Sequence, residues 1–321
     1  MHINVIGGSG FIGTVLCKRF VEKKMNFSIM DKAQSISFPM KVAIGDVRSA
    51  EDLDRCLSSN SILINLAAEH RDDVTPSSLY DEVNVEGAKN ICQAAIRKNI
   101  NTIIFTSSVA VYGFCEKETD ENGTINPFND YGRTKYEAEL VYREWQSEDP
   151  LSRKLIIIRP TVVFGEGNKG NVYNLLNQIH LNKFIMIGKG ENKKSIAYVE
   201  NIAAFIDFAM NIDSQFTIVN YVDKPDYKMN ELIIKINREL NRKIKTNRFY
   251  MPYVIGVSIG KIFDLMAMLF NKKISISAVR VKKFCAHSVY SSSNPLLGKF
   301  ESPFSLDEGL SRTIKFEFFG Y

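Results

Sequence analysis

Three side chains in the middle of the chain have the types and the spacing needed to move a proton. Tyr131 and Lys135 are four residues apart, so a helix would place them on one face. A free tyrosine has a pKa of about 10 and is a poor base at neutral pH, but an ammonium group one turn away favours the phenolate and lowers that pKa. Ser108 follows an apolar run, so its hydroxyl could hold the same substrate oxygen. We predict that Ser108, Tyr131 and Lys135 form a catalytic set that takes and returns the proton of a hydroxyl.

A glycine-rich turn near the start of the chain predicts a site for a dinucleotide. Gly7-Gly8-Ser9-Gly10-Phe11-Ile12-Gly13 follows an apolar run and opens an amphipathic stretch. In a strand–turn–helix unit, Gly7 permits the tight turn, Gly10 lets the backbone approach a pyrophosphate, and Gly13 lets the helix pack on the sheet. Such turns also occur for purely structural reasons, but the position at the first strand favours the dinucleotide. A nicotinamide ring held here could exchange a hydride with the substrate, and its positive charge would also favour the Tyr131 phenolate.

Two acidic residues after the next strands indicate which dinucleotide is bound. Asp31 lies 18 residues past Gly13, where a carboxylate accepts hydrogen bonds from the ribose hydroxyls and repels a 2′-phosphate. This favours NAD over NADP, although Lys32 is adjacent and Asp31 could be only a turn residue. Asp46, in Gly45-Asp46-Val47-Arg48, could bind the adenine amino group, but this is also a common turn sequence.

The elements that must position these residues follow from hydrophobic periodicity. Short apolar runs at 2–6, 27–30, 42–44, 62–66, 102–106 and 155–158 alternate with helical spacing at 13–24, 83–98 and 131–144. This alternation predicts an α/β fold, a Rossmann-type doubly wound parallel sheet, as the NAD-binding domain over residues 1–165. Helical segments at 172–181, 199–210 and 229–240, with short strands between them, predict a smaller mixed α/β substrate-binding lobe over residues 166–321.

Charge is distributed unevenly along the chain. The net charge is +5, but residues 241–300 hold eleven basic residues and one acidic residue, Asp264, so this segment is +10 and the remainder is −5. A local basic segment favours a local anionic partner rather than nucleic acid. The segment flanks the apolar stretch 251–270, in which helical spacing puts Lys261 and Asp264 on one face. Such a helix could lie in a membrane surface while the lysines attract anionic headgroups or a lipid diphosphate, or it could be a core helix with a solvated basic rim.

Cysteine usage and hydropathy bear on the compartment. The five cysteines are scattered and never spaced as C-x-x-C, which argues against a disulfide framework or a metal site and fits a reducing cytosol. The first expected strand begins at His2, leaving no room for a signal peptide, and no uncharged apolar stretch of roughly 18 residues is present. We expect a cytoplasmic protein, peripheral at the inner face of the cytoplasmic membrane.

Together these motifs resemble those of the extended short-chain dehydrogenase/reductases, in the group of NAD-dependent epimerases and dehydratases. The resemblance spans the chain through the glycine loop, Asp31, Asn65-Leu66-Ala67-Ala68, Asn84-Val85-Glu86-Gly87, Ser107-Ser108, Tyr131/Lys135 and Ser305-Leu306-Asp307-Glu308-Gly309-Leu310. It implies that Asn84 supports the strand beneath the cofactor and that two copies pair through helices, while His70 could also be an ordinary loop residue. The NAD contacts predicted from the motifs and the resemblance are Gly7, Gly10, Phe11, Ile12, Gly13, Asp31, Lys32, Asp46, Val47, Leu66, Ala67, Ala68, His70, Asn84, Ser107, Tyr131 and Lys135.

The residues after Ser108 discriminate between reactions. Family members that dehydrate sugars place an Asp-Glu pair directly after the catalytic Ser or Thr, whereas Val109-Ala110-Val111 stands here. Dehydration therefore lacks its acid. What remains suits reversible oxidation of one sugar hydroxyl, as in a 4-epimerase, in which tightly bound NAD accepts the hydride and returns it to the opposite face.

A closer resemblance concerns the substrate. Segments 67–74, 159–166, 170–176 and 279–286 look like the bacterial O-antigen epimerases, which act on N-acetylglucosamine linked through diphosphate to undecaprenol. Soluble UDP-sugar epimerases usually carry an arginine where this chain has Lys194, which argues against a UDP mode of binding. We predict substrate contacts from Ser108, Asn171, Lys194 and Arg280. A soluble UDP-glucose or UDP-N-acetylglucosamine 4-epimerase and a nucleotide-sugar ketoreductase remain alternatives; a redox-sensing regulator is disfavoured by the Tyr131/Lys135 pair.

Overall fold

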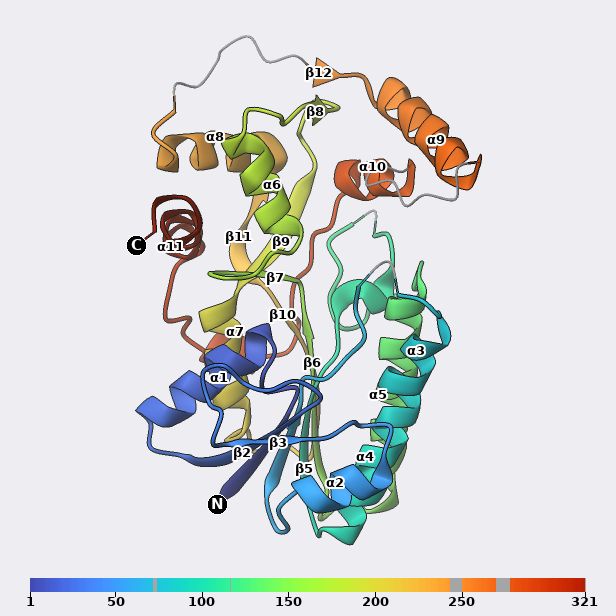
Figure 1. Ribbon diagram of the computed structural model, residues 1–321, viewed down its shortest axis with the longest axis vertical. Coiled ribbons are helices and arrows are strands. Elements are labelled where there is room, and N and C mark those ends of the chain that lie inside the picture. Colours follow the sequence, from blue (N-terminus) through green and yellow to red (C-terminus); the bar gives the residue numbers. More distant parts are fainter. Residues whose placement is uncertain (72–73, 116, 243–249, 270–277, 321) are drawn as a thin grey trace.

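A seven-stranded sheet forms the centre of the computed structural model, which describes residues 1–71, 74–115, 117–242, 250–269 and 278–320 (Figure 1). The strand order is β10-β6-β5-β4-β1-β2-β3, and every neighbouring pair is parallel. This confirms the predicted Rossmann-type sheet, and the observed strand ends differ from the expected ones by two residues at most. The strands are β1 (His2–Ile6), β2 (Asn26–Asp31), β3 (Val42–Ile44), β4 (Ile62–Asn65), β5 (Thr102–Thr106), β6 (Lys154–Pro160) and β10 (Phe216–Tyr221).

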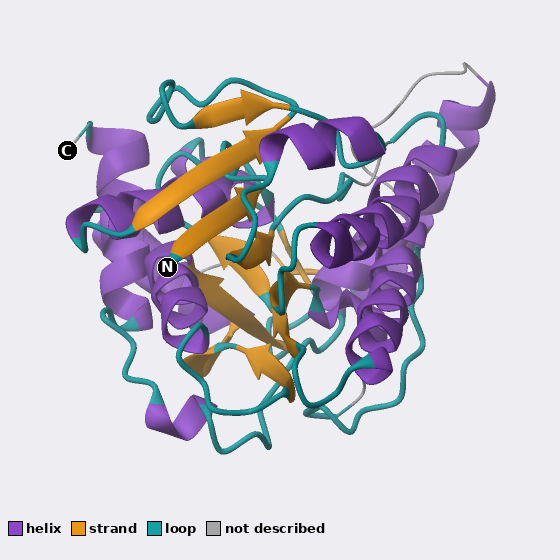
Figure 2. Ribbon diagram, turned by 90° about the horizontal axis from the view of Figure 1, so that it is seen from below, coloured by secondary structure: helices purple, strands orange, loops and turns teal. Residues whose placement is uncertain are grey.

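Helices cover both faces of this sheet, as Figure 2 shows from below. Alternating side chains of one strand serve the two layers, since Val5 belongs to one buried cluster and Ile6 to the other. The first layer contains α1 (Phe11–Glu22) and α7 (Val199–Ala209). The second layer contains α2 (Ala50–Cys56), α4 (Gly87–Arg97) and α5 (Asp130–Glu148), with α3 (Ser78–Tyr80) and the π-helical segment η1 (Asp81–Glu86) leading into α4.

The chain returns to the large sheet after the expected domain boundary. Strand β10 pairs with β6, and α7 packs on α1, where Arg19 Nε lies 2.7 Å from Asp207 Oδ2. The predicted division at residues 165 and 166 is therefore a division of the sequence more than of the structure. Short strand β10 contains Ile218, Val219 and Asn220 and resembled the other short strands of the second half, so periodicity alone could not assign it to a sheet.

The smaller lobe lies at the carboxyl ends of the parallel strands (Figure 1). It contains the mixed sheet β11-β9-β7, with β7 (Val162–Phe164), β9 (Lys193–Tyr198) and β11 (Asp223–Lys228), and the pair β12-β8, with β8 (Met186–Ile187) and β12 (Tyr250–Met251). The helices that surround these strands are α6 (Asn171–His180), α8 (Met229–Glu239), α9 (Tyr253–Leu269), α10 (Ala278–Cys285) and α11 (Leu306–Phe319).

Helix α9 is not the core helix that its apolar sequence allowed. Its two glycines, Gly256 and Gly260, are buried, and a Cβ on Gly256 would lie 2.8 Å from Ile187. By contrast, Val254 is 72% exposed and Ile262 is 57% exposed. Lys261 is also exposed. No helix among the described residues is long and apolar enough to cross a membrane. Helix α9 therefore presents an apolar surface outward while its glycine face packs against the protein.

Candidate active site

The glycine loop joins β1 to α1 in close contact with the backbone that follows β4. Gly7 has φ +79°, a left-handed conformation that favours glycine, and its N–H donates to the Met30 carbonyl. A Cβ there would lie 2.7 Å from the Ala67 nitrogen and 2.9 Å from the Leu66 carbonyl carbon, and one on Gly13 would lie 2.5 Å from the Gly7 oxygen. The backbone itself therefore forms the surface of the loop, and it contacts the segment that follows β4.

The first turn of α1 is open for an anion. Gly10 is its N-cap residue, and no side chain among the described residues caps this turn. The amides of Phe11, Ile12 and Gly13 are therefore available at the positive end of a helix dipole, which is the arrangement that binds a pyrophosphate. The side-chain-free cradle and the uncapped turn fit NAD. Phe11 also borders the smaller lobe, since a Cβ on Gly165 would lie 3.3 Å from its ring.

Asp31 ends β2 beside the glycine loop. Its carboxylate accepts hydrogen bonds from the backbone N–H groups of Ser9 and Ala33, both at 3.0 Å. These bonds orient the carboxylate at the carboxyl end of the strand, where a ribose would lie in this fold. Lys32 Nζ is 3.9 Å from Glu69 Oε2, so the adjacent lysine has an acidic partner on the neighbouring loop. The geometry supports the expected NAD preference.

The Asp46–Val47 turn lies farther along the same edge. The Asp46 carboxylate pairs with Arg48 at 2.8 Å, and hydrogen bonding from that guanidinium lowers the pKa of Asp46. Val47 is buried, and a Cβ on Gly87 would lie 2.8 Å from it. The Asp46 carboxylate is therefore ionised, and Arg48 takes up part of its hydrogen-bonding capacity. Contact of Asp46 or Val47 with an adenine remains a prediction.

Asn84 links the loop after β4 to the helix that carries Tyr131. It is buried, accepts a hydrogen bond from Glu69 N (2.8 Å), and donates to Glu69 O (3.0 Å) and Thr134 Oγ1 (2.9 Å). Asn84 therefore stabilises the loop after β4 and not, as expected, the strand beneath the cofactor. His70 is exposed on the same loop, and its Nδ1 lies 3.5 Å from the Ala68 carbonyl oxygen.

The structure brings Tyr131 and Ser108 together through the first turn of α5. Asn129 caps this turn by accepting a hydrogen bond from Gly132 N, and a Cβ on Gly132 would lie 2.5 Å from the Ala110 oxygen. The glycine therefore lets α5 rest on η2 (Val109–Tyr112), the short 3-10 helix that Ser108 caps. The Ser108 side chain lies close enough to the Tyr131 hydroxyl to act on its pKa.

Burial dominates the acid–base properties of this pair. Desolvation raises the pKa of Tyr131, and the hydrogen bond from Ser108 only partly opposes it. Lys135 is also buried, with Nζ 4.2 Å from the centroid of the Phe105 ring, and desolvation lowers the pKa of its ammonium to about 7. The expected lowering of the Tyr131 pKa by Lys135 is therefore not seen in the protein alone, because burial penalises the charged form of both groups.

A buried polar network behind this set was missed from the sequence. Glu139 accepts hydrogen bonds from the Ser107 hydroxyl (2.5 Å) and from Arg159 through both carboxylate oxygens (2.9 and 2.5 Å). Arg159 also donates to the Tyr112 hydroxyl (2.7 Å), which in turn donates to Asn220 (2.9 Å). The Ser107 side chain thus faces this network, which leaves its predicted NAD contact to the backbone. The available signal was Glu139 itself, four residues after Lys135 on the same helix face.

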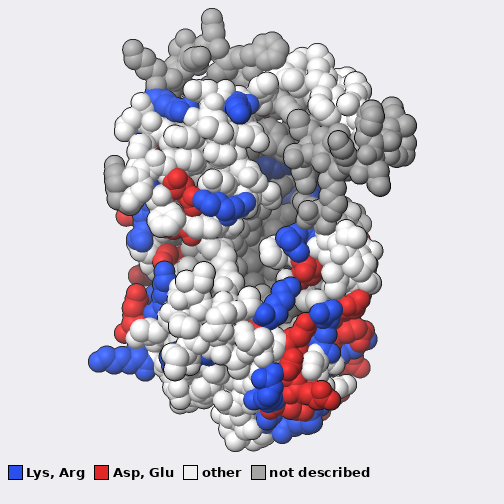
Figure 3. Space-filling view, in the orientation of Figure 1, with Lys and Arg blue, Asp and Glu red and all other residues white. Residues whose placement is uncertain are grey.

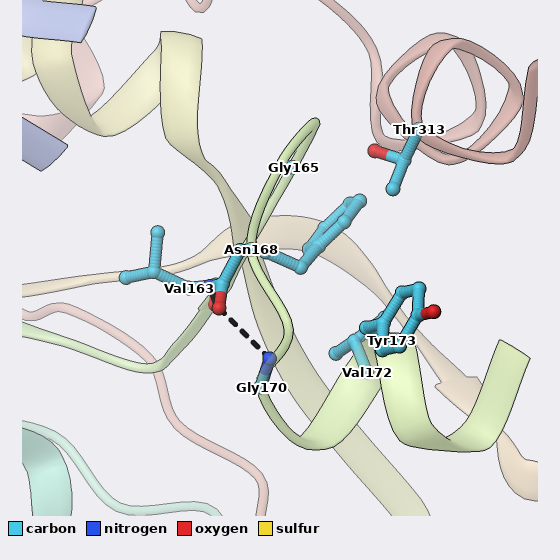
Figure 4. A pocket seen from close by; sticks show the side chains of 8 residues that line it. Val163, Gly165, Asn168, Gly170, Val172, Tyr173 and Thr313 are labelled. Carbon is cyan, nitrogen blue, oxygen red and sulfur yellow. Dashed lines mark hydrogen bonds between the residues drawn. The ribbon is translucent and has the colours of Figure 1, made fainter. Parts of the chain in front are cut away.

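Asn171 begins α6 at the edge of the smaller lobe, where its side chain is exposed. The preceding loop, residues 165–170, is held in place, since Asn168 Oδ1 accepts a hydrogen bond from Gly170 N at 2.9 Å (Figure 4). Glu317 of α11 accepts another from Gly167 N at 2.8 Å. The start of this loop borders the glycine loop, since Gly165 lies near the Phe11 ring, while a substrate contact of Asn171 remains a prediction.

Lys194 occupies a different environment from the one expected for a phosphate ligand. Its ammonium donates to the carbonyls of Lys283 and Ala286, both at 2.7 Å, and to Ser288 Oγ at 3.3 Å. These bonds tie the end of α10 to β9, and burial lowers the pKa of Lys194 to about 8. A direct phosphate contact would require these bonds to be exchanged. The side chain of Arg280 lies outside the described residues.

The parts of the site meet at one edge of the sheet. The glycine loop follows β1, Ala67 follows β4, and Ser108 follows β5, and these three strands are neighbours. The carboxyl ends of parallel strands form the usual binding edge of such sheets. A hydride acceptor on the glycine loop and a proton acceptor at Tyr131 would therefore face one substrate.

Comparison with known proteins agrees with this arrangement. The chain matches the NAD dependent epimerase/dehydratase family over residues 3–220. It is 46% identical over 318 residues to the N-acetyl-alpha-D-glucosaminyl-diphospho-ditrans,octacis-undecaprenol 4-epimerase of Escherichia coli O157:H7, which covers 99% of this chain and 95% of that protein.

Solved structures show the same fold. MoeE5 in complex with UDP-glucose and NAD superposes with a TM-score of 0.77 at 18% identity, covering 98% of both chains. The UDP-N-acetylglucosamine 4-epimerase from Methanobrevibacter ruminantium M1 gives 0.73 at 21% identity, covering 98% of this chain and 97% of that one. With its sheet, glycine loop and near full-length sequence match, the chain belongs to the NAD dependent epimerase/dehydratase family, and its cofactor is NAD.

Proposed function

We propose that this protein is a 4-epimerase that interconverts N-acetylglucosamine and N-acetylgalactosamine linked by diphosphate to undecaprenol, for O-antigen or another surface polysaccharide. The observation that carries the proposal is the 46% identity, over nearly the whole of both chains, to the Escherichia coli O157:H7 protein with that activity in its name. The site supports it, because Ser108 and Tyr131 are neighbours at the same sheet edge while Val109-Ala110-Val111 supplies no acid for dehydration.

In this mechanism Tyr131 and Ser108 act on the 4-hydroxyl of the sugar. Ser108 holds the oxygen, and the Tyr131 phenolate removes its proton as the C4 hydride leaves. NAD, bound at the glycine loop and Asp31, supplies the chemistry of accepting that hydride and returning it. After the 4-keto sugar has turned over in the pocket, Tyr131 gives its proton back to the oxygen. Burial disfavours the phenolate in the protein alone, so the ammonium of Lys135 and the positive charge of bound NAD would have to stabilise it together. No net redox change occurs.

A product assay with two substrates tests this function. Purified protein with NAD is given lipid-linked and UDP-linked N-acetylglucosamine in parallel, and the released sugars are separated. We expect rapid conversion of the lipid-linked sugar without consumption of added NADH. Rapid conversion of the UDP-linked sugar, with the lipid-linked one untouched, would overturn the proposed substrate. Stoichiometric use of NADH or NADPH would indicate a ketoreductase instead.

The outward face of α9 supports a position at the inner surface of the cytoplasmic membrane. Val254, Ile255 and Ile262 are exposed there beside Lys261, a combination that suits an anionic lipid surface. Flotation with anionic phospholipid vesicles tests it. Val254→Glu/Ile262→Glu should abolish flotation, whereas Leu151→Glu, which changes an exposed leucine outside α9, should not. Equal flotation of all three proteins would refute this placement.

Helices α4 and α5 support a homodimer. They pack together and expose Ile96 and Leu140, respectively. Pairing of this surface with a second copy would cover both side chains. Sedimentation should show a dimer for the wild type and a monomer for Ile96→Glu/Leu140→Glu. A monomeric wild type would refute the pairing.

A further inference from the structure

Two phenylalanines whose rings contact each other are exposed beside the candidate active site. Phe114 is 48% exposed and Phe128 is 38% exposed, and their ring centroids are 4.6 Å apart. Aromatic rings are usually buried, because each one removes a large apolar area from water. A pair of contacting rings left at the surface is therefore a candidate binding surface for an apolar ligand.

The local backbone holds this pair next to the reacting groups. Phe128 directly precedes Asn129, which caps the helix turn that carries Tyr131. Phe114 follows Gly113, which ends the short helix capped by Ser108. Gly113 has φ +72°, and a Cβ on it would lie 2.0 Å from the Asn126 oxygen, so the two segments touch closely. One ring thus extends from each of the two segments that supply Ser108 and Tyr131.

A cation from the smaller lobe lies over the aromatic pair. Lys283 Nζ is 4.5 Å from the centroid of the Phe128 ring. Lys283 belongs to α10, which packs against α9 with its exposed apolar residues. Figure 3 shows further Lys and Arg side chains along the hollow between the two parts of the molecule. Contacts therefore link the aromatic pair through Lys283 to α10, and α10 to the apolar helix α9.

We propose that Phe114, Phe128 and Lys283 form the subsite for the diphosphate and the first isoprene units of a polyprenyl-linked substrate. Lys283 provides charge for the diphosphate, and the two rings provide apolar area for the prenyl chain as it leaves toward α9. This inference rests on the proposed function and deepens it, since it assigns a site to the prenyl chain, which a UDP-sugar lacks.

The test compares three substrates that differ only beyond the diphosphate. N-acetylglucosamine diphosphate is esterified with a methyl group, with citronellol or with undecaprenol, and KM and kcat are measured for each. Phe114→Ala/Phe128→Ala should raise the KM ratio of the citronellyl to the methyl substrate about tenfold, with little change in kcat. Phe114→Leu/Phe128→Leu, which keeps apolar side chains, should largely restore the ratio. Lys283→Gln should raise KM for all three substrates.

The test includes a matched control variant, and two different outcomes would contradict the subsite and the proposed function separately. Phe316→Ala removes another half-exposed ring, on α11, and should behave as the wild type; thermal melting shows whether each variant is folded. An unchanged KM ratio in folded Phe114→Ala/Phe128→Ala would overturn the subsite while leaving the proposed function intact. A wild-type protein that converts none of the lipid-linked sugars would overturn the proposed function and the subsite with it.

Discussion

Removal of Arg159 should damage the protein much more than removal of Arg159 and Glu139 together. Their side chains are 3% and 0% exposed, and the guanidinium and carboxylate are joined by two hydrogen bonds. Arg159→Met leaves the Glu139 carboxylate buried with the Ser107 hydroxyl as its remaining hydrogen-bond donor from this network. Breaking one side of a buried pair typically costs about 3–5 kcal/mol, because the surviving charge has lost its solvent and its partner.

Replacing both residues removes that uncompensated charge. Substitution of a buried pair by apolar side chains of similar volume is often close to neutral, so Arg159→Met/Glu139→Met should recover most of the loss. Two costs remain, because Ser107 loses an acceptor and Tyr112 loses a donor, at roughly 1 kcal/mol each. We therefore expect the double variant to be about 1–3 kcal/mol more stable than Arg159→Met alone, which would show that the two positions are energetically coupled.

Urea unfolding followed by tryptophan emission measures this coupling. The chain has a single tryptophan, Trp145, which is buried in α5 on the helix that carries Glu139. The free energy of unfolding is compared among the wild type, the two single variants and the double variant. If Arg159→Met is no less stable than the double variant, the pair is not coupled as its geometry indicates and the reasoning is refuted.

Three other changes test the site. Tyr131→Phe should reduce turnover at least about 100-fold while NAD still binds, because only the proton acceptor is lost; activity close to wild type would refute the role of Tyr131. Gly13→Ala should abolish NAD binding in a titration, since its Cβ would lie 2.5 Å from backbone atoms, and a wild-type affinity would show that the loop can adapt. The pKa of Lys135 is depressed from 10.5 to about 7, so the folded protein binds fewer protons than the unfolded chain between these values. Its stability relative to Lys135→Met should therefore rise from about pH 7 to pH 10, and parallel stability curves for the two proteins would contradict this.

Local patterns predicted the parts of the molecule that depend on neighbours in the sequence. The parallel sheet with helices on both faces could be predicted from alternating apolar runs, and the glycine loop from its glycine spacing between a strand and a helix. The pairing of Ser108 with Tyr131 also followed, because each begins a helix at the same sheet edge.

Contacts between distant segments were not predictable in the same way. Lys194 donates to carbonyls about ninety residues later in the chain, and Arg159 on β6 pairs with Glu139 on α5. The predicted direction of the Tyr131 pKa shift was also wrong. The shift depends on burial, which a spacing of four residues does not reveal.

Strand β10 is synthesised after β6, so the large sheet is incomplete when the first 160 residues of the chain have been made. A nascent chain that has just completed β6 has the sequence of the cofactor loop and the Ser108/Tyr131 pair, but the open edge of β6 still exposes backbone groups ready to pair with any strand. Helix α1 likewise lacks α7, which covers it later. The sheet therefore lacks its edge strand β10 until residue 221 has been synthesised, and a chain truncated between residues 160 and 221 should expose the edge of β6 to pairing with other strands.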